Sequence, residues 1–135
     1  MTDYHHPGAG FIIVKKLSTG WKVLGLKIGE KYDLPKGRVE TKDKGNLFLT
    51  AQRECFEECG ILISSKNLKW GNSSIQLGNL TLFIAETDID PIIRINPQTG
   101  VYEHEAAEWL DWNALEKKVY GYLGPAIVWA RNHIE

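Results

Sequence analysis

The chain has 135 residues, with 16 Lys and Arg against 17 Asp and Glu, so its formal net charge is -1 and its sequence pI is about 6.4. This length fits one domain that buries a core without disulfides or a structural metal. The near-neutral charge argues against a dedicated nucleic-acid surface, which needs an excess of cations to bind phosphates. A composition of 43% hydrophobic and 24% charged residues excludes a disordered chain.

The sequence also bears on membranes and on the cellular compartment. The longest apolar run, Ala126–Ala130, has five residues, which is too short to span a bilayer. The first ten residues contain no basic segment followed by an apolar stretch, so we expect no secretory signal. Cys55 and Cys59 lie one helical turn apart and cannot staple a fold, which favours a reducing, cytoplasmic location.

Strands are predicted where short apolar or alternating runs lie between turn residues, at Phe11–Lys16, Trp21–Lys27, Leu68–Trp70, Ser74–Leu77, Leu80–Glu86 and Glu108–Trp112. Turn residues 18–20 favour a hairpin between the first two strands. Pro35 pushes the residue before it toward an extended conformation. Gly37 then frees the backbone to turn into a polar loop that ends at Gly45.

The clearest helix is predicted over Leu47–Cys59, with Asn46 as its N-cap and Gly60 as the left-handed residue that ends it. At 100° per residue, one side of this helix is mostly apolar and collects Phe48, Gln52, Cys55, Phe56 and Cys59. Three carboxylates lie together on the opposite side, from Glu54, Glu57 and Glu58. The helix is therefore expected to bury its apolar side and to present three acids.

Two helices are predicted near the end of the chain. Asp111 or Asn113 can cap a short helix that runs through Lys118. Pro125, after Gly124, opens the last helix, which contributes apolar side chains from Ile127, Val128 and Ile134. Strands and helices in this mixed order predict a single α/β domain over residues 1–135, with a mixed sheet sandwiched by helices.

The three clustered carboxylates point to a function because like charges one turn apart destabilise a helix. Either some of them are protonated, or a divalent cation lies between them. Clustered carboxylate oxygens are the ligands that Mg2+ and Ca2+ prefer. The sequence therefore predicts a metal site on this side of the helix.

The stretch from Gly37 to Ile61 resembles the Nudix box, which has the pattern G-x5-E-x7-R-E-U-x-E-E-x-G-U, with U a bulky apolar residue. In its second half, all specified positions but one match the pattern. The matching residues are Arg53, Glu54, Glu57, Glu58, Gly60 and Ile61. Cys55 takes a position usually held by an aliphatic residue, and a small apolar thiol fits there. The resemblance implies a Nudix-type α/β/α sandwich.

The first half of the box departs from the pattern. Gly37 and Arg53 are 16 positions apart, where the pattern has 14, so the loop is two residues longer. Counted from Gly37, the acidic position of the box falls on Asp43; counted back from Arg53, it falls on Gly45. Glu40 also matches a residue often seen in the family.

The resemblance assigns roles by position. Glu54, Glu57 and Glu58 would bind Mg2+ or Mn2+, with more than one ion and with the Gly37 carbonyl as a further ligand. Arg53 would orient a carboxylate by a charge-assisted hydrogen bond. Two nearby cations, Lys36 and Arg38, would contact the phosphates of a nucleotide substrate.

A second acidic segment, Tyr102-Glu103-His104-Glu105, precedes the sequence Glu108-Trp109-Leu110. It resembles a loop of the diadenosine tetraphosphate hydrolases that supplies another metal-binding or base carboxylate. By its distance from Trp109, Glu103 takes that place, and Glu105 is the alternative.

The family hydrolyses a nucleoside diphosphate linked to another group, so the resemblance implies a metal-dependent enzyme that cleaves a pyrophosphate bond in a small nucleotide. Dinucleoside polyphosphates are the first candidates, and ADP-ribose, flavin dinucleotides and modified nucleoside triphosphates remain open. A Nudix scaffold that binds nucleotide or Ca2+ without turnover is the alternative class, and a structural protein with an acidic face is a third. Candidates for stacking on a base are Tyr32, Tyr102 and Tyr120.

Overall fold

A computed structural model describes residues 4–135. Residues 1–3 lie outside the described part, and they belong to the N-terminal segment in which we expect no secretory signal. It contains one six-stranded sheet with both parallel and antiparallel pairs. The strands are β1 (Tyr4–Leu17), β2 (Gly20–Ile28), β3 (Lys31–Asp33), β4 (Lys36–Arg38), β5 (Ser74–Glu86) and β6 (Ala106–Leu110). The helices are α1 (Leu47–Cys59), α2 (Trp112–Lys118) and α3 (Gly124–Ile134), and short 3-10 turns cover Thr41–Asp43, Ser65–Asn67 and Gly121–Leu123.

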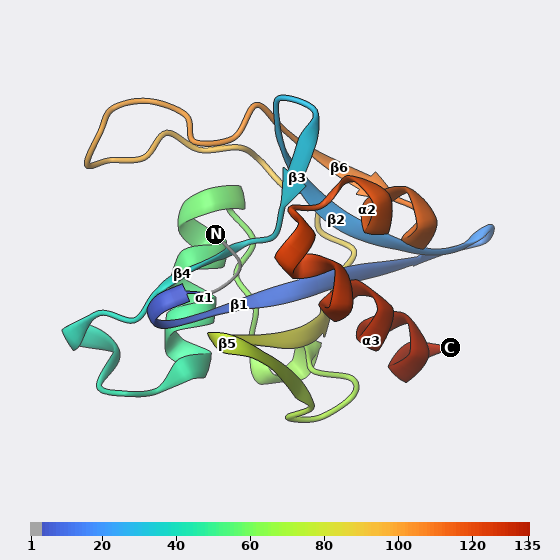
Figure 1. The fold of residues 1–135 in the computed structure, drawn as a ribbon, viewed down its shortest axis with the longest axis horizontal. Helices are drawn as coiled ribbons and strands as arrows, with labels where there is room; N and C mark the ends of the chain where they lie inside the picture. The colour runs from blue at the N-terminus through green and yellow to red at the C-terminus, as the bar shows by residue number, and fades with distance from the viewer. Residues whose placement is uncertain (1–3) are drawn as a thin grey trace.

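The sheet is organised around β1 (Figure 1). This strand pairs with β5 in parallel and with β2 and β4 antiparallel. The β1–β2 hairpin closes at Leu17 and Gly20, which confirms the predicted turn. On its far side, β2 pairs antiparallel with β3 and β6.

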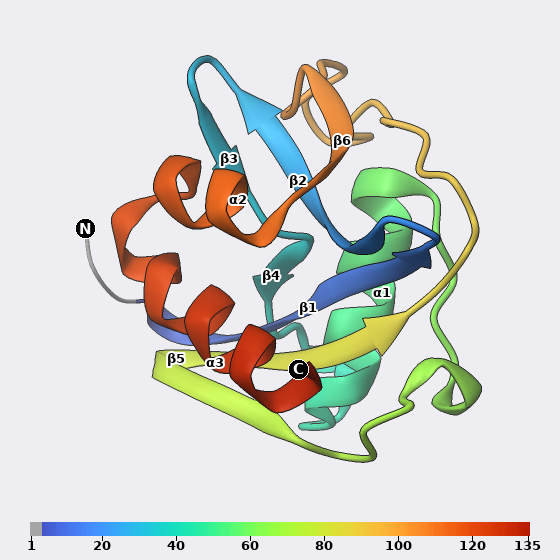
Figure 2. The ribbon, with the colours of Figure 1, turned by 90° about the vertical axis from the view of Figure 1, so that its right-hand side faces the viewer.

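The two faces of the sheet carry separate cores because side chains alternate along each strand. Phe11 and Ile13 of β1 pack with Cys55 and Cys59 of α1 on one face. The other face packs alternate β-strand residues against α2 and α3, including Ile12, Val14, Leu82, Leu115, Ala126 and Ile127. Figure 2 shows α1 behind the sheet and α3 in front of it, so the predicted mixed sheet between helices is confirmed.

Helix α1 has the predicted bounds, and both of its predicted ends are confirmed. The Asn46 side chain accepts hydrogen bonds from the backbone N–H groups of Phe48 and Leu49, at 3.0 and 3.2 Å. Gly60 has a φ of 71°, in the left-handed region. Phe56 departs from the predicted buried side of the helix, because the residue is 44% exposed. The guanidinium of Arg94 lies over its ring, 4.6 Å from the ring centroid.

Several strand predictions are corrected. Leu68–Trp70 is a turn that follows a 3-10 turn, and its side chains pack as loop residues against the two cores. Ser74–Leu77 and Leu80–Glu86 form one strand that passes through a left-handed Gly78. The predicted Glu108–Trp112 strand lies two residues earlier, because Asp111 begins α2.

The expected turn and loop from Gly37 to Gly45 are also corrected. Gly37 lies in β4 and pairs with Ala9, so it does not turn the chain. The loop proper contains a 3-10 turn over Thr41–Asp43.

In the last helix, Val128 is 39% exposed and adds less to the core than its neighbours Ile127 and Ala130.

Among the helices of residues 4–135, none has the length and apolar character needed to cross a membrane.

Candidate active site

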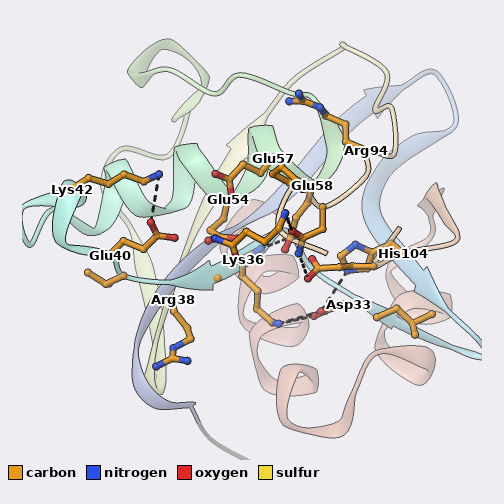
Figure 3. A pocket seen from close by; sticks show the side chains of 17 residues that line it. Asp33, Lys36, Arg38, Glu40, Lys42, Glu54, Glu57, Glu58, Arg94 and His104 are labelled. Atoms are coloured by element: carbon orange, nitrogen blue, oxygen red, sulfur yellow. Dashed lines mark hydrogen bonds and ion pairs between the residues drawn. The ribbon is translucent and has the colours of Figure 1, made fainter. Parts of the chain in front are cut away.

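A cavity of about 960 Å³ opens between the α1–β4 side of the sheet and the segment 87–105 that joins β5 to β6, called here the 87–105 loop. Figure 3 shows Glu54, Glu57 and Glu58 extending from α1 beside β4, with Asp33 and His104 at one end of the cavity. The loop contributes Glu103 to the lining. Predicted site residues from three parts of the chain therefore face one cavity.

Gly37 allows β4 to approach α1 closely. A Cβ atom at this position would lie 2.0 Å from the carboxyl carbon of Glu54 and 2.2 Å from its Oε1. No other residue type leaves that space open. Gly37 is therefore needed for the closeness of the Glu54 carboxylate to the strand backbone.

Arg53 is the centre of a hydrogen-bond network on the side of the cavity formed by α1. Its guanidinium donates to both oxygens of Asp43, at 3.1 and 2.8 Å, and to Glu54 Oε2 at 2.8 Å. It also donates to Glu40 Oε2 at 3.1 Å and to the Arg38 carbonyl at 3.0 Å. A guanidinium with this many acceptors holds a single orientation, so it fixes the neighbouring Glu54 carboxylate.

Asp43 is buried beside Arg53, which gives a structural role to the acid of the lengthened loop. Its carboxylate also accepts from the Thr50 hydroxyl at 2.7 Å and from the Glu40 backbone N–H at 2.9 Å. The Arg53 hydrogen bonds hold the pKa of Asp43 well below its ordinary value, and Asp43 in turn raises the pKa of Arg53. The extra loop residues thus form a compact turn that aims Asp43 inward.

Burial disfavours the charged forms of two of the α1 carboxylates, Glu54 and Glu58. Burial raises the pKa of Glu54 to about 7, even though Arg53 lowers it, and Glu57 and Glu40 add repulsion. Burial also raises the pKa of Glu58 well above its ordinary value, and repulsion from Glu54 and Asp33 adds to this while Lys36 opposes it. These two acids would therefore be stabilised by an added cation.

The opposite side of the cavity is built from the 87–105 loop. Asn96 donates from its side chain to Glu103 Oε1 at 2.8 Å, and Glu103 is exposed. Glu105 instead accepts from the Gly29 backbone N–H at 2.7 Å, in the β2–β3 turn. The structure thus directs Glu103 to the cavity and uses Glu105 to anchor the loop.

The two predicted phosphate-binding cations differ in placement. The Lys36 side chain is 8% exposed, and its ammonium lies 2.9 Å from an oxygen of Asp33. Arg38 is exposed, and its guanidinium points away from the acids of α1 in Figure 3. Contact of either cation with phosphate stays a prediction.

Asp33 and His104 also line the cavity, and neither was among the predicted catalytic, metal or substrate-binding residues. His104 is 6% exposed, and its Nε2 lies 3.7 Å from Asp33 Oδ2. The sequence holds no spacing signal that joins residues so far apart. Only the proximity of His104 to Glu103 in the sequence could have drawn attention to it.

The three candidate stacking tyrosines lie in different environments. Tyr32 is 5% exposed and donates its hydroxyl hydrogen to Glu108, so its ring belongs to the core. Tyr120 packs against the same core. Tyr102 is 60% exposed and lines a smaller cavity of about 560 Å³ that also borders Glu103.

Within residues 4–135, no three His, Cys, Asp or Glu side chains are already arranged to hold a metal ion. One oxygen of Glu54 accepts from Arg53, and one oxygen of Glu58 accepts from the Lys36 backbone N–H at 3.2 Å. The donor set nevertheless fits a hard divalent cation, because all its atoms are oxygens and burial raises the pKa of Glu54 and Glu58 despite the neighbouring Arg53 and Lys36. Each of the two carboxylates has a second oxygen through which it could ligate.

No family model matches the sequence, and no curated protein sequence matches it either. Solved structures do match. A C. elegans Ap4A hydrolase has a TM-score of 0.67 at 17% identity, over 91% of this chain and 93% of that chain. The NUDIX domain of Shewanella oneidensis NrtR, complexed with ADP ribose, has a TM-score of 0.66 at 12% identity, over 98% and 90%. A MutT protein from Methanosarcina mazei Go1 has a TM-score of 0.64 at 18% identity, over 98% and 99%.

The chain therefore has the Nudix fold over nearly its whole length, which confirms the fold that its sequence resemblance predicts. At these identities the likeness establishes the fold alone, because one fold can carry many activities.

Proposed function

We propose that this protein is a metal-dependent hydrolase that cleaves a pyrophosphate bond in a nucleoside diphosphate derivative. The observation that carries the proposal is that Glu54, Glu57 and Glu58 of α1 and Glu103 of the 87–105 loop line one cavity of a Nudix fold. Dinucleoside polyphosphates are the first substrates to test, because the sequence around Glu103 resembles that of diadenosine tetraphosphate hydrolases. The fold's likeness to an Ap4A hydrolase supports this choice.

The metal in this proposal is Mg2+ or Mn2+, with more than one ion. The ligands would be the carboxylates of Glu54, Glu57, Glu58 and Glu103, with the Gly37 carbonyl. When bound, such ions neutralise the charge that develops on pyrophosphate oxygens and lower the pKa of a coordinated water. The burial that raises the pKa of Glu54 and Glu58 is the feature that favours binding of these ions, because a cation would stabilise the charged carboxylates.

The protein residues supply orientation and proton transfer. Arg53 keeps one Glu54 oxygen in a fixed hydrogen bond, which directs the other oxygen toward the cavity. A carboxylate of the set accepts a proton from the attacking water, and attack at phosphorus breaks the bond to the leaving phosphate oxygen. Glu103 serves either as this base or as a ligand, since it faces the α1 acids across the cavity.

The test is a panel of nucleotides incubated with the protein and with Mg2+ or Mn2+, and the products identified by mass. The panel holds dinucleoside polyphosphates, ADP-ribose, flavin dinucleotides and modified nucleoside triphosphates. Hydrolysis in 18O-labelled water identifies the phosphorus attacked. Glu57→Gln should lower turnover, and the matched control Glu116→Gln, on the exposed side of α2, should not. Lack of any product across the panel would contradict the proposal.

A nucleotide-binding module without turnover is the second candidate. It is favoured by the lengthened loop before Arg53, which places Gly45 where the box has an acidic residue in register with Arg53. It predicts that nucleotide raises the melting temperature while no product forms. Both candidates fit a cytoplasmic protein with reduced cysteines, and Cys55 and Cys59 are free and buried.

A further inference from the structure

We propose that Asp33 is a positioning residue that joins the two sides of the cavity, holding the 87–105 loop and the β4–α1 acids in one arrangement. The kinetic part of this inference rests on the proposed hydrolase function. The structural part stands without it, because it concerns contacts between elements that are distant in sequence.

Asp33 ends β3, at the point where the chain enters β4 through Leu34 and Pro35. Its side chain is 15% exposed and lines the cavity. One of its oxygens accepts from the Leu34 backbone N–H at 2.8 Å, which fixes the carboxylate relative to its own backbone. The same carboxylate then makes contacts in two directions.

In the first direction, Asp33 holds Lys36. The ammonium lies 2.9 Å from one carboxylate oxygen and 3.2 Å from the other. The backbone N–H of Lys36 donates to Glu58 Oε1 at 3.2 Å. Pinning the Lys36 side chain therefore steadies the backbone group that orients the Glu58 carboxylate.

In the second direction, Asp33 contacts His104. This imidazole is nearly fully buried, with its Nε2 3.7 Å from Asp33 Oδ2. His104 is next to Glu103, so its placement sets where the Glu103 side chain begins. Two further contacts secure this end of the loop, from the Glu105 backbone N–H to the Lys27 carbonyl and from Gly29 to the Glu105 carboxylate.

The charge of Asp33 matters to both contacts. Burial alone would raise the pKa of Asp33, but His104 and Lys36 together lower it below its ordinary value. Asp33 is thus held as the charged partner of Lys36, whereas at Glu54 and Glu58 burial is the dominant effect and raises the pKa. This pairing separates it from the α1 acids and fits an orienting role.

The test compares Asp33→Asn with His104→Gln and with Asp90→Asn. Asp90 is the matched control, because it pairs with Lys15 at 3.2 Å but is 79% exposed. Hydrogen exchange is measured at the Asn96 and Glu105 backbone N–H groups, which donate to the Val101 and Lys27 carbonyls, and at core amides of β1. Steady-state kinetics are measured with the substrate that the panel identifies.

Asp33→Asn should speed exchange at the two loop amides by about 10-fold and leave the β1 amides unchanged. It should lower kcat by about 10-fold and change KM by less than about 2-fold, because an orienting partner acts on the reacting geometry. His104→Gln should speed exchange at the loop amides to a similar extent. The double variant should have a kcat no lower than that of Asp33→Asn alone, because both changes break the same contact. Asp90→Asn should change none of these.

Unchanged loop exchange in both Asp33→Asn and His104→Gln would overturn the inference. So would equal acceleration at loop and β1 amides, which would mark Asp33 as a general stability residue. If the wild-type protein hydrolyses nothing, the proposed function fails, and the exchange measurements still decide whether Asp33 joins the two sides.

Discussion

The two sides of the cavity are built in different ways. On the α1 side, Arg53 is 13% exposed and bonds Asp43 and Glu54, so its geometry is fixed by buried charge-assisted hydrogen bonds. On the loop side, Glu103 is exposed and has one bond from Asn96. This contrast indicates that the α1 side is preorganised, and that the loop side depends on a few contacts at its end.

The largest effect is expected from Glu58→Gln, on the preorganised side. Loss of this charge should lower kcat on the order of 10³-fold, as for removal of a group that stabilises transition-state charge. The metal-free variant should melt at a higher temperature than wild type at pH 8. The reason is that burial raises the pKa of Glu58, so at pH values above its ordinary pKa of 4.5 folding must either take up a proton or bury a charge, and both cost stability.

Kinetics with Mn2+ and thermal unfolding with a chelator measure these two outcomes, with Glu116→Gln as the control in both. Gln keeps an oxygen that can accept from the Lys36 backbone N–H, so the comparison isolates the charge. A lower melting temperature together with unchanged kcat would remove Glu58 from the site.

The next effect concerns stability and the Asp43–Arg53 pair. Asp43→Asn should cost about 3 kcal/mol at pH 7, because it leaves a buried guanidinium without one of its partners. Glu40→Gln is the matched control, since Glu40 contacts the same Arg53 but is 45% exposed, and it should cost under about 1 kcal/mol. Urea unfolding measures both values, and similar losses would contradict the assigned role of Asp43.

The same pair makes a pH-dependent contribution of known sign. The folded-state pKa of Asp43 lies below its ordinary value of 3.8, so the pair stabilises the protein above about pH 4. This stability is lost as the pH falls further and Asp43 takes up a proton. The difference between wild type and Asp43→Asn should therefore shrink below pH 4 in acid unfolding, and a constant difference would argue against the pairing.

Gly37→Ala should separate function from stability. The three atoms nearest to the added methyl group all belong to the carboxyl group of Glu54, the end of a flexible side chain, so the free energy of unfolding should change by about 1 kcal/mol or less. Moving Glu54 off its position should lower kcat by about 10- to 100-fold. Gly121→Ala is the control, because no heavy atom lies within 4 Å of its added carbon. A Gly37→Ala protein with full activity would mean that the position of Glu54 is unimportant.

The same contrast explains which features could be predicted from the sequence. Helix α1 was predicted with both ends because capping and helical spacing are local. The short strands β3 and β4 were missed, since their pairing partners are supplied by β2 and β1. Nothing local reveals that Asp33 meets His104, 71 residues later, or that Arg94 covers Phe56.

The smallest predicted effect lies on the loop side. Glu103→Gln should lower kcat by about 10-fold with little change in KM, if its carboxylate acts as base or ligand only as the reaction proceeds. Its free energy of unfolding should change by less than about 0.5 kcal/mol, because the residue is exposed and Gln can still accept from Asn96. Glu105→Gln provides the comparison: it should loosen the anchor at Gly29 while keeping the Glu103 carboxylate. Kinetics of both variants with hydrogen exchange of the 87–105 loop distinguish a chemical role from an anchoring role. If Glu103→Gln left kcat unchanged and Glu105→Gln lowered it, the roles of the two acids would be reversed.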